Sequence, residues 1–342
     1  MNKRRQRRRR ILLIKRCAIA AVALLLVVVG VVVLLNTLNR DDKTTSQLFL
    51  PYRANTVSVE EPKAMTTGEL PSLFADGLCI SKESETLDKN ITSLSAAVYN
   101  RTTGEVIYSE EADTHRAQAS ITKLLTFYIA LEYGKLDDVV IVRGEWLENL
   151  DPDSSVCDIK DGDEITLEQL LYGLMMPSGN DAANAIAYHI SGSESAFVDL
   201  MNETAKRLGM TNSHFMNAHG LDDPNHYSCV YDIYLVFNRL LDYDFFRQVI
   251  GTQNYTANFT NNGEERVESW SRGIWYFNGN RKMPAGLTGI GGKTGTTPGA
   301  QYCLSYSFSD EAGNEYIAIT LYSGKRERMY NVMDVLLSKV AN

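Results

Sequence analysis

The sequence predicts a globular domain of the mixed α/β class (α+β), in which strands stand at both ends of the fold and helices lie between them. Residues 93–108, 289–308 and 315–323 have the composition and alternation of strands. Between these stretches, apolar residues recur every three or four positions, as in helices. With 342 residues and 44% hydrophobic composition, the chain can bury a sizeable core.

Charge is divided unevenly along the chain. Residues 1–16 carry nine Lys or Arg residues and no acid, so the formal net charge of −8 leaves −17 for the rest. An acidic body of this kind argues against nucleic-acid binding by the folded part.

Residues 17–35 predict a transmembrane helix, because they carry no charge and as a helix would span roughly 28 Å, close to a bilayer core. The basic residues 1–16 then lie in the cytoplasm and the rest of the chain outside. The alternative is a cleaved signal peptide, but no Ala-x-Ala-like site follows Leu35. The polar residues 36–89 are expected to form an extracytoplasmic stalk.

Four cysteines follow the predicted span, and we expect them to be unpaired. Cys79, Cys157, Cys229 and Cys303 are even in number, which permits two disulfides in an exported protein. Their spacings match no known disulfide framework, and a domain of this size does not need such links for stability.

The elements of the domain follow in order. A hairpin comes first, with strands at residues 93–99 and 105–108, and a short strand follows at 139–142. Apolar period, capping residues and terminating Gly or Pro predict helices at residues 121–133, 165–176, 181–190, 195–208, 231–241 and 325–340. Residues 251–285 are rich in Asn, Gly and Thr and are expected to form strands and loops.

The stretch around Ser120 carries the first chemical signal. Ser120 and Lys123 stand one turn apart at the start of the amphipathic helix 121–133, so the Lys123 amine can reach the Ser120 hydroxyl. A lysine can act as the base for a serine nucleophile if burial or a second cation lowers its pKa. Because Ser-x-x-Lys also occurs by chance, it requires support from other motifs.

Two further motifs supply that support. Ser178-Gly179-Asn180 lies between two predicted helices, in a loop that can present both polar side chains to a cleft; the alternative is an ordinary helix cap. Lys293-Thr294-Gly295 is expected at the start of a strand, where the lysine is the second cation and the glycine leaves room for substrate.

Residues 214–223 contain two histidines and two aspartates, which suggests a zinc site. They contain no His-x-x-x-His or Cys-x-x-Cys pattern, so a structural loop is the favoured interpretation. We therefore predict no metal and no cofactor.

With these motifs, the chain resembles the serine D-alanyl-D-alanine carboxypeptidases, the low-molecular-weight penicillin-binding proteins. The motifs read Ser120-Ile-Thr-Lys123, Ser178-Gly179-Asn180 and Lys293-Thr294-Gly295-Thr296, and the likeness extends through residues 170–184, 215–223 and 226–227. The resemblance implies a β-lactamase/penicillin-binding-protein-like αβα sandwich with an antiparallel sheet, joined to an all-helical subdomain. The active site would lie at their junction, and residues 90–342 would form the catalytic domain.

The resemblance also implies how the peptide bond is broken. Ser120 would attack the D-Ala-D-Ala bond to form an acyl-enzyme, and Lys123 would accept the serine proton. Ser178 would pass a proton to the leaving D-alanine, and Asn180 would orient the peptide amide.

Substrate binding is assigned to the third motif by the same resemblance. Lys293 would bind the terminal carboxylate, with Thr294 and Thr296, and would lower the pKa of Lys123. Gly295 would leave room for the peptide, and the backbone N–H groups of Ser120 and Thr296 would hold the oxyanion. The partners implied are peptidoglycan stem peptides ending in D-Ala-D-Ala, β-lactam antibiotics as covalent inhibitors, and the membrane.

Two alternatives share this fold. A β-lactamase would need an extra carboxylate to activate the deacylating water, and no convincing Glu-x-x-x-Asn loop motif is present in the right region. Gly179, where β-lactamases usually have Asp, also favours the carboxypeptidases. A non-catalytic wall-binding scaffold would be expected to have degenerate motifs, whereas all three are intact. Cys229 stands where relatives tend to have a small hydroxyl residue, which leaves the local hydrogen bonding open.

Overall fold

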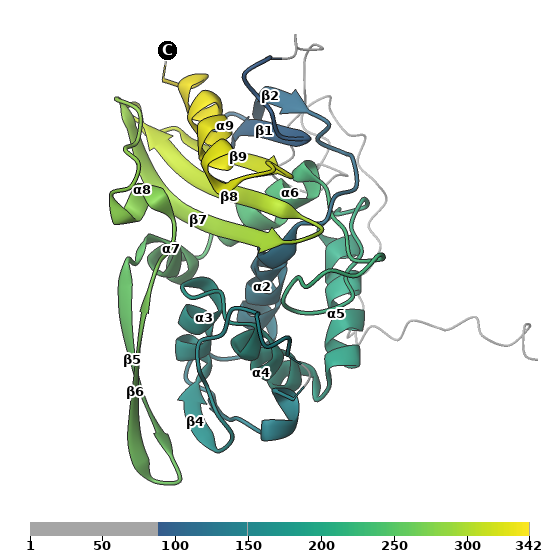
Figure 1. The fold of residues 1–342 in the computed structure, drawn as a ribbon, viewed down its shortest axis with the longest axis vertical. Coiled ribbons are helices and arrows are strands. Elements are labelled where there is room, and N and C mark those ends of the chain that lie inside the picture. Colours follow the sequence, from purple (N-terminus) through teal and green to yellow (C-terminus); the bar gives the residue numbers. More distant parts are fainter. Residues whose placement is uncertain (1–87, 149, 342) are drawn as a thin grey trace, which may run out of the picture. The chain divides into compact units, whose positions relative to one another are not determined.

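The computed structural model describes residues 88–148 and 150–341, and a five-stranded antiparallel sheet lies at the centre of this part (Figure 1). The strand order is β2-β1-β9-β8-β7. The strands are β1 (Ser95–Asn100), β2 (Glu105–Glu110), β7 (Leu287–Thr297), β8 (Gln301–Asp310) and β9 (Glu315–Leu321). The predicted hairpin is confirmed, and β1 pairs directly with β9 from the end of the chain.

Helices cover both faces of this sheet. On one face α9 (Arg326–Ser338) packs on a core that includes Val98, and on the other α6 (Val230–Leu240) and α2 (Lys123–Tyr133) pack on a core that includes Tyr99. Neighbouring strand residues point to opposite faces, so each strand contributes to both cores. The predicted αβα sandwich and the terminal helix are confirmed.

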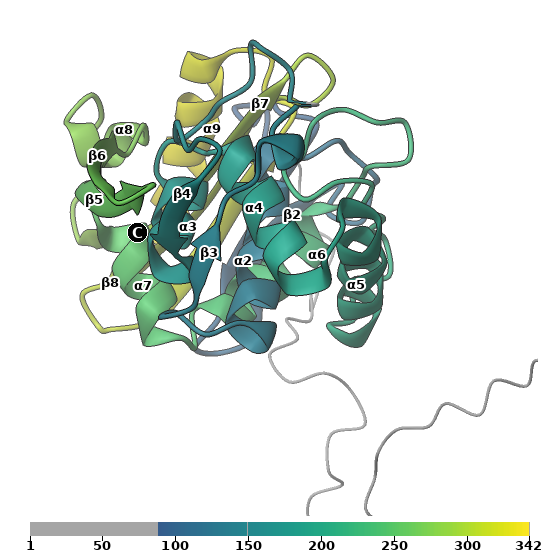
Figure 2. The ribbon, with the colours of Figure 1, turned by 90° about the horizontal axis from the view of Figure 1, so that it is seen from below.

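Helices also surround α2 on the side away from the sheet. They are α3 (Leu167–Met175), α4 (Asn180–Ser191) and α5 (Glu194–Arg207), which lie around α2 in Figure 2. All three are predicted helices. Local signals explain the starts of two of them: Thr166 and Gln169 form a capping box before α3, and the Ser193 hydroxyl caps α5.

This part of the fold is not helical throughout, because it also carries a small antiparallel sheet. The strands, in the order β3-β4-β5-β6, are β3 (Val139–Ile141), β4 (Asp163–Thr166), β5 (Asn254–Asn261) and β6 (Glu264–Ser271). The prediction did not include β4, whose four residues are too short for a period, nor the helix α7 (Asp244–Gly251), which follows α6 closely. The short element η2 (Gly144–Trp146) also lies in this region, whereas the short helix α8 (Trp275–Asn278) packs against α9 on the five-stranded sheet.

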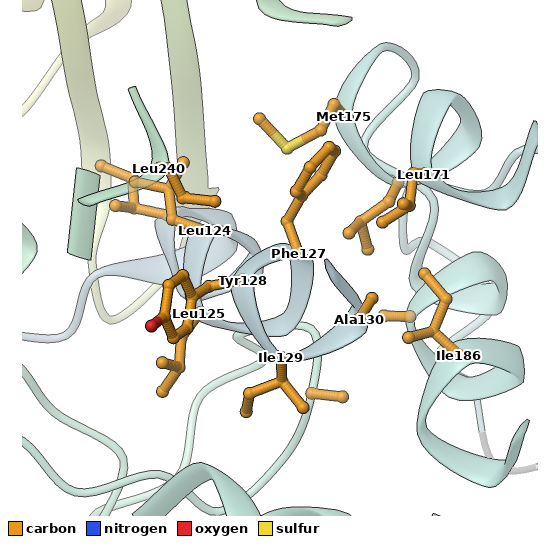
Figure 3. Close-up of a cluster of buried hydrophobic side chains, with 14 of the residues drawn as sticks. Leu124, Leu125, Phe127, Tyr128, Ile129, Ala130, Leu171, Met175, Ile186 and Leu240 are labelled. Atoms are coloured by element: carbon orange, nitrogen blue, oxygen red, sulfur yellow. The ribbon is translucent and has the colours of Figure 1, made fainter. Parts of the chain in front are cut away.

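The helix α2 is buried nearly all round, so the prediction that it is amphipathic is wrong. Every residue from Lys123 to Ala130 is buried. Figure 3 shows why: side chains of α2 such as Phe127 and Ala130 point toward Met175 on α3 and Ile186 on α4, while Leu124 lies near Leu240 on α6. A helix enclosed by a sheet and by other helices has no solvent face to mark with polar residues.

The run 289–308 is two strands, not one. Residues Thr297 to Gln301 form the turn between β7 and β8, and Gln301 adopts a positive φ of 56°. Consequently Lys293, Thr294 and Gly295 lie well inside β7 rather than at the start of a strand. Since β7 is the last strand in the sheet order, one of its edges stays free of other strands of that sheet.

The expected transmembrane helix and stalk, residues 17–89, lie outside the described residues apart from the last two. In the described ranges, no helix is both long enough and apolar enough to cross a membrane. Cys157, Cys229 and Cys303 are buried free thiols, as expected, and Cys79 is outside these ranges.

Candidate active site

Ser120 lies in a tight turn that leads into α2. The turn is the 3-10 helix η1 (Ala119–Thr122), and Ala119 before the serine has φ of +49°, which non-glycine residues rarely adopt. Such a strained backbone persists only where its surroundings hold it, and it is frequent at functional sites. Ser120 is half-buried and lies just before the buried helix α2.

Two glycines from two distant segments of the chain pack closely against this turn. A Cβ atom at Gly220 would lie 2.0 Å from the Ala119 carbonyl oxygen, and one at Gly295 would lie 2.7 Å from the Gln118 carbonyl oxygen. The loop 217–223 and the strand β7 therefore both approach η1 at a distance that only glycine allows. The third motif is brought against the first in this way, and Thr296 follows directly on Gly295.

The amine of Lys123 is arranged as a base. It is fully buried, and its partners within the described ranges are Ser120 Oγ at 3.0 Å, Asn180 Oδ1 at 2.6 Å and the His219 carbonyl oxygen at 2.9 Å. The amide and carbonyl oxygens can only accept hydrogen bonds. In a neutral amine they take both N–H protons, and the lone pair then points to the Ser120 hydroxyl.

The electrostatics of Lys123 agree with this arrangement. Burial lowers the pKa of Lys123 to about 7, while the nearby Asp181 carboxylate and Cys157 thiol act to raise it. Burial is therefore the cause of the lowered pKa, because a low-dielectric site disfavours the ammonium form. Near neutral pH a large fraction of Lys123 is therefore uncharged.

The second motif presents both of its polar side chains to the lysines. Ser178 has φ of +66°, its Oγ accepts a hydrogen bond from Lys293 Nζ at 2.8 Å, and Asn180 accepts from Lys123. The residue at the N-cap position of α4 is Gly179. The alternative of an ordinary helix cap is therefore wrong for both side chains.

Lys293 is buried and faces two other basic groups. Its Nζ donates to Ser178 Oγ and to the Thr294 carbonyl oxygen, each at 2.8 Å. Burial, and then the charges of Lys123 and Arg272, hold the pKa of Lys293 well below its usual range. Arg272 is itself 4% exposed and donates to the Thr252 and Gly292 carbonyl oxygens. The structure thus gathers cations at a place where an anion would be favoured.

Sequence reasoning missed three residues that the structure brings to this site. They are Arg272 behind Lys293, His219 whose carbonyl oxygen binds Lys123, and Asp181 below the second motif. Asp181 had a readable signal, since it is an acid directly after Asn180 in the first turn of a predicted helix. His219 lies in residues 215–223, which share the family resemblance, but its contact is through the backbone carbonyl, which the residue type does not reveal. Arg272 had no signal that separates it from an ordinary surface arginine.

The histidines of residues 214–226 have other partners than a metal. His226 Nδ1 accepts from the Met216 N–H at 3.0 Å, so in the neutral ring Nε2 donates to Thr122 Oγ1 at 2.8 Å. Burial lowers the pKa of His226 to about 4 and that of His219, together with the Lys123 charge, to about 3. These contacts favour the structural-loop interpretation of the segment.

Comparison with known proteins agrees with the geometry. The family model described as D-alanyl-D-alanine carboxypeptidase matches residues 81–323. D-alanyl-D-alanine carboxypeptidase DacF of Bacillus subtilis (strain 168) is 36% identical over 220 residues, which are 62% of this chain and 53% of that protein. The chain thus spans about half the length of this relative.

A second relative matches over nearly its whole length. The D-alanyl-D-alanine carboxypeptidase of Streptomyces sp. (strain K15) is 32% identical over 270 residues, covering 76% of this chain and 90% of that protein. The crystal structure titled as the Streptomyces K15 DD-transpeptidase superposes with a TM-score of 0.68 at 28% identity, covering 75% of this chain and 100% of that one. With the Ser120, Ser178 and Lys293 motifs gathered in one site, the chain belongs to the D-alanyl-D-alanine carboxypeptidase family of serine peptidases.

Proposed function

We propose that this protein removes the terminal D-alanine from peptidoglycan stem pentapeptides through an acyl-enzyme on Ser120. The observation that carries the proposal is the Lys123 amine, which has two acceptor oxygens on one side and the Ser120 hydroxyl on the other. A neutral lysine in this setting accepts the serine proton as the hydroxyl attacks the peptide carbonyl.

The tetrahedral intermediate needs donors for its oxyanion. We assign these to the backbone N–H groups of Ser120 and Thr296, supported by the contact of Gly295 with the turn before Ser120. One such donor is typically worth about 3 kcal/mol of transition-state stabilisation. Ser178, which accepts a hydrogen bond from Lys293, passes a proton to the departing amine, and Asn180 orients both Lys123 and the substrate amide.

The terminal carboxylate of the substrate binds at Lys293, with the hydroxyl groups of Thr294 and Thr296. Arg272, whose pKa burial lowers only to about 10, keeps its positive charge near neutral pH and favours an anion at Lys293 before the ligand arrives. Binding of the carboxylate favours the ammonium form of Lys293, because an opposite charge at short range raises the pKa of a lysine. Substrate binding is therefore coupled to proton uptake at Lys293.

Release of a bound penicillin is expected to be slow, which separates this function from that of a β-lactamase. Fast release needs a carboxylate free to activate water. Asp181, the acid that faces Lys123, already accepts hydrogen bonds from the N–H groups of Cys157, Ile159 and Ala182. Rapid turnover of nitrocefin by the purified ectodomain would favour the β-lactamase alternative.

We further propose that residues 17–35 anchor the protein in the cell membrane by a single helix, with residues 1–16 in the cytoplasm. The support is the sequence: an uncharged stretch long enough to cross a bilayer follows a basic leader. Residues 36–89 then carry the catalytic domain, residues 90–342, toward its substrate in the wall.

The test uses the ectodomain and a defined pentapeptide. We expect release of one D-alanine from the wild-type protein and covalent labelling by a fluorescent penicillin, both lost in Ser120→Ala. Release of D-alanine by the Ser120→Ala protein would exclude the serine mechanism. Binding of wall fragments by a wild-type protein that neither releases D-alanine nor is labelled would favour the scaffold alternative.

A further inference from the structure

The Asp181 carboxylate is buried beneath the Ser178–Asn180 turn. It is 2% exposed and accepts hydrogen bonds from the backbone N–H of Cys157 at 2.9 and 3.0 Å, of Ile159 at 3.2 Å and of Ala182 at 2.9 Å. Burial raises the pKa of Asp181, while the N–H groups of Cys157 and Ala182 act to lower it. A carboxylate in the first turn of α4 is also stabilised by the positive end of that helix.

These bonds tie a separate segment to the turn. The N–H of Asn180 donates to the Ser155 carbonyl oxygen at 2.8 Å, so residues 155–159 are held at both Asn180 and Asp181. Gly179 lies directly over this contact: a Cβ atom there would be 2.6 Å from Asp181 Oδ1 and 3.1 Å from Cys157 Cβ. The position of the turn that carries Ser178 and Asn180 thus depends on the Asp181 carboxylate.

Asp181 is also part of the charge balance around Lys123. Four titratable groups face that amine: Lys293 on β7, His219 on the loop 217–223, and the pair Asp181 and Cys157. Burial keeps the imidazole of His219 neutral by lowering its pKa to about 3, and raises the pKa of the Cys157 thiol well above its usual range. The Asp181 carboxylate acts to raise the pKa of Lys123, whereas repulsion between Lys123 and Lys293 disfavours the protonation of both lysines.

We propose that Asp181 is a positioning residue of the acylation step: its carboxylate fixes the Ser178–Asn180 turn and places a negative charge beside Lys123 that opposes the charge of Lys293. The inference rests on the proposed serine acyl-enzyme function and adds a residue that does not touch the substrate. In this inference, Asp181 keeps Asn180 within hydrogen-bond distance of the base Lys123.

The test compares Asp181→Asn with Asp163→Asn. Asp163 is another fully buried aspartate that accepts a backbone N–H, from Lys160 at 2.7 Å, but it belongs to β4 in the small sheet. Both variants lose a buried carboxylate, so both are expected to melt at a lower temperature than the wild-type protein. The measurement is the second-order rate of acylation by a fluorescent penicillin as a function of pH.

For Asp181→Asn we expect the acidic limb of the profile to move down by about one pH unit, because loss of a nearby anion lowers the pKa of a lysine. The plateau rate should fall roughly tenfold or more as the base weakens and the turn loosens. For Asp163→Asn the limb should stay where it is in the wild-type protein. A limb that does not move in a folded Asp181→Asn protein, or that moves equally in both variants, would overturn the inference.

If the Asp181→Asn protein does not fold, the hydrogen bonds that hold residues 155–159 to Asn180 and Asp181, here called the clamp, are tested in the wild-type protein by amide hydrogen exchange. The N–H groups of Cys157 and Ile159 should then exchange as slowly as those of the buried helix residues Ala185 and Ile186. Fast exchange at Cys157 and Ile159 would contradict the clamp. Failure of the wild-type protein to be acylated at all would instead contradict the proposed function, so the two ideas fail separately.

Discussion

Lys293 and Ser178 meet across the active site, with Nζ of the lysine 2.8 Å from Oγ of the serine, although they are 115 positions apart in the sequence. The same lysine repels Lys123. Because the repulsion between two ammonium groups is mutual, protonation of either lysine makes protonation of the other less favourable. The two lysines therefore hold one proton more easily than two, and the carboxylate of a bound substrate favours the ammonium form of Lys293.

Removing Lys293 should shift the pH dependence of acylation. In the wild-type protein we expect the acylation rate to rise with pH through the pKa of Lys123, which is about 7. In Lys293→Ala that rising limb should move to higher pH, because loss of a neighbouring cation makes the ammonium form of Lys123 easier to hold. The limb is measured from the rate of labelling by a penicillin between pH 5 and about pH 10.

The matched control is Lys339→Ala. Lys339 lies beyond the end of α9, away from the site, and pairs with Asp88 at 3.0 Å. The Lys339→Ala variant therefore loses the same charge as Lys293→Ala, but outside the site. Its profile should superpose on that of the wild-type protein. An unmoved limb in Lys293→Ala would mean that burial alone sets the basicity of Lys123.

Gly295 should be intolerant of a methyl group. In Gly295→Ala the new Cβ would lie 2.7 Å from the Gln118 carbonyl oxygen and 3.1 Å from the Ser120 nitrogen. We expect β7 and η1 to separate, which misplaces the proposed oxyanion donors and lowers kcat/KM for the pentapeptide roughly a hundredfold. Gly273→Ala is the control, since nothing lies within 4 Å of its Cβ position, and near wild-type activity is expected there. Equal activity of the two variants would remove the structural argument for the Thr296 donor.

Cys229 stands at the N-cap of α6, where its Sγ atom accepts a hydrogen bond from the Asp232 N–H at 3.4 Å. This answers the question that the sequence left open, because the thiol takes the place of a capping hydroxyl. Cys229→Ala should lower the free energy of unfolding by about 1 kcal/mol, whereas Cys229→Ser should keep or increase it. Urea unfolding monitored by circular dichroism measures both, and a serine variant less stable than the alanine variant would contradict the capping role.

The parts of this fold that could be predicted from sequence are those with local causes. The Thr166–Gln169 capping box, the β1–β2 hairpin and the helical periods each depend on residues a few positions apart. The residues of the three motifs could also be selected as candidate site residues, because a serine nucleophile, a lysine base and a second lysine can be recognised from the residue types. The individual contacts between the motifs, such as those of Lys293 with Ser178 and of Lys123 with Asn180, could not be predicted from the sequence.

What could not be predicted depends on contacts between distant segments. The burial of α2 on all sides follows from helices and strands at residues 165–320 packing around it. The positive φ of Ser178 and the effect of Arg272 on Lys293 depend on tertiary contacts, which form only when β7 packs against η1. Short elements such as β4 carry too few residues to show a period, and their pairing with distant strands determines them.

The buried amine of Lys123 should make the stability of the protein depend on pH in a defined window. Its pKa is about 7 in the folded state against 10.5 for the unperturbed group. Between these values the unfolded chain binds more protons at this site than the folded one, so this contribution to the free energy of unfolding rises with pH. It is least favourable below about pH 7, where the folded protein must hold a buried ammonium group.

Lys123→Met removes this contribution while filling similar volume. We expect the stability of the wild-type protein to increase relative to that of Lys123→Met as the pH is raised from about 7 toward 10.5, measured as the difference in urea midpoints at each pH. The difference, rather than either curve alone, cancels the titration of groups that both proteins share. A constant difference across this window would mean that Lys123 titrates at its ordinary pKa in the folded state, and the neutral-amine mechanism would lose its basis.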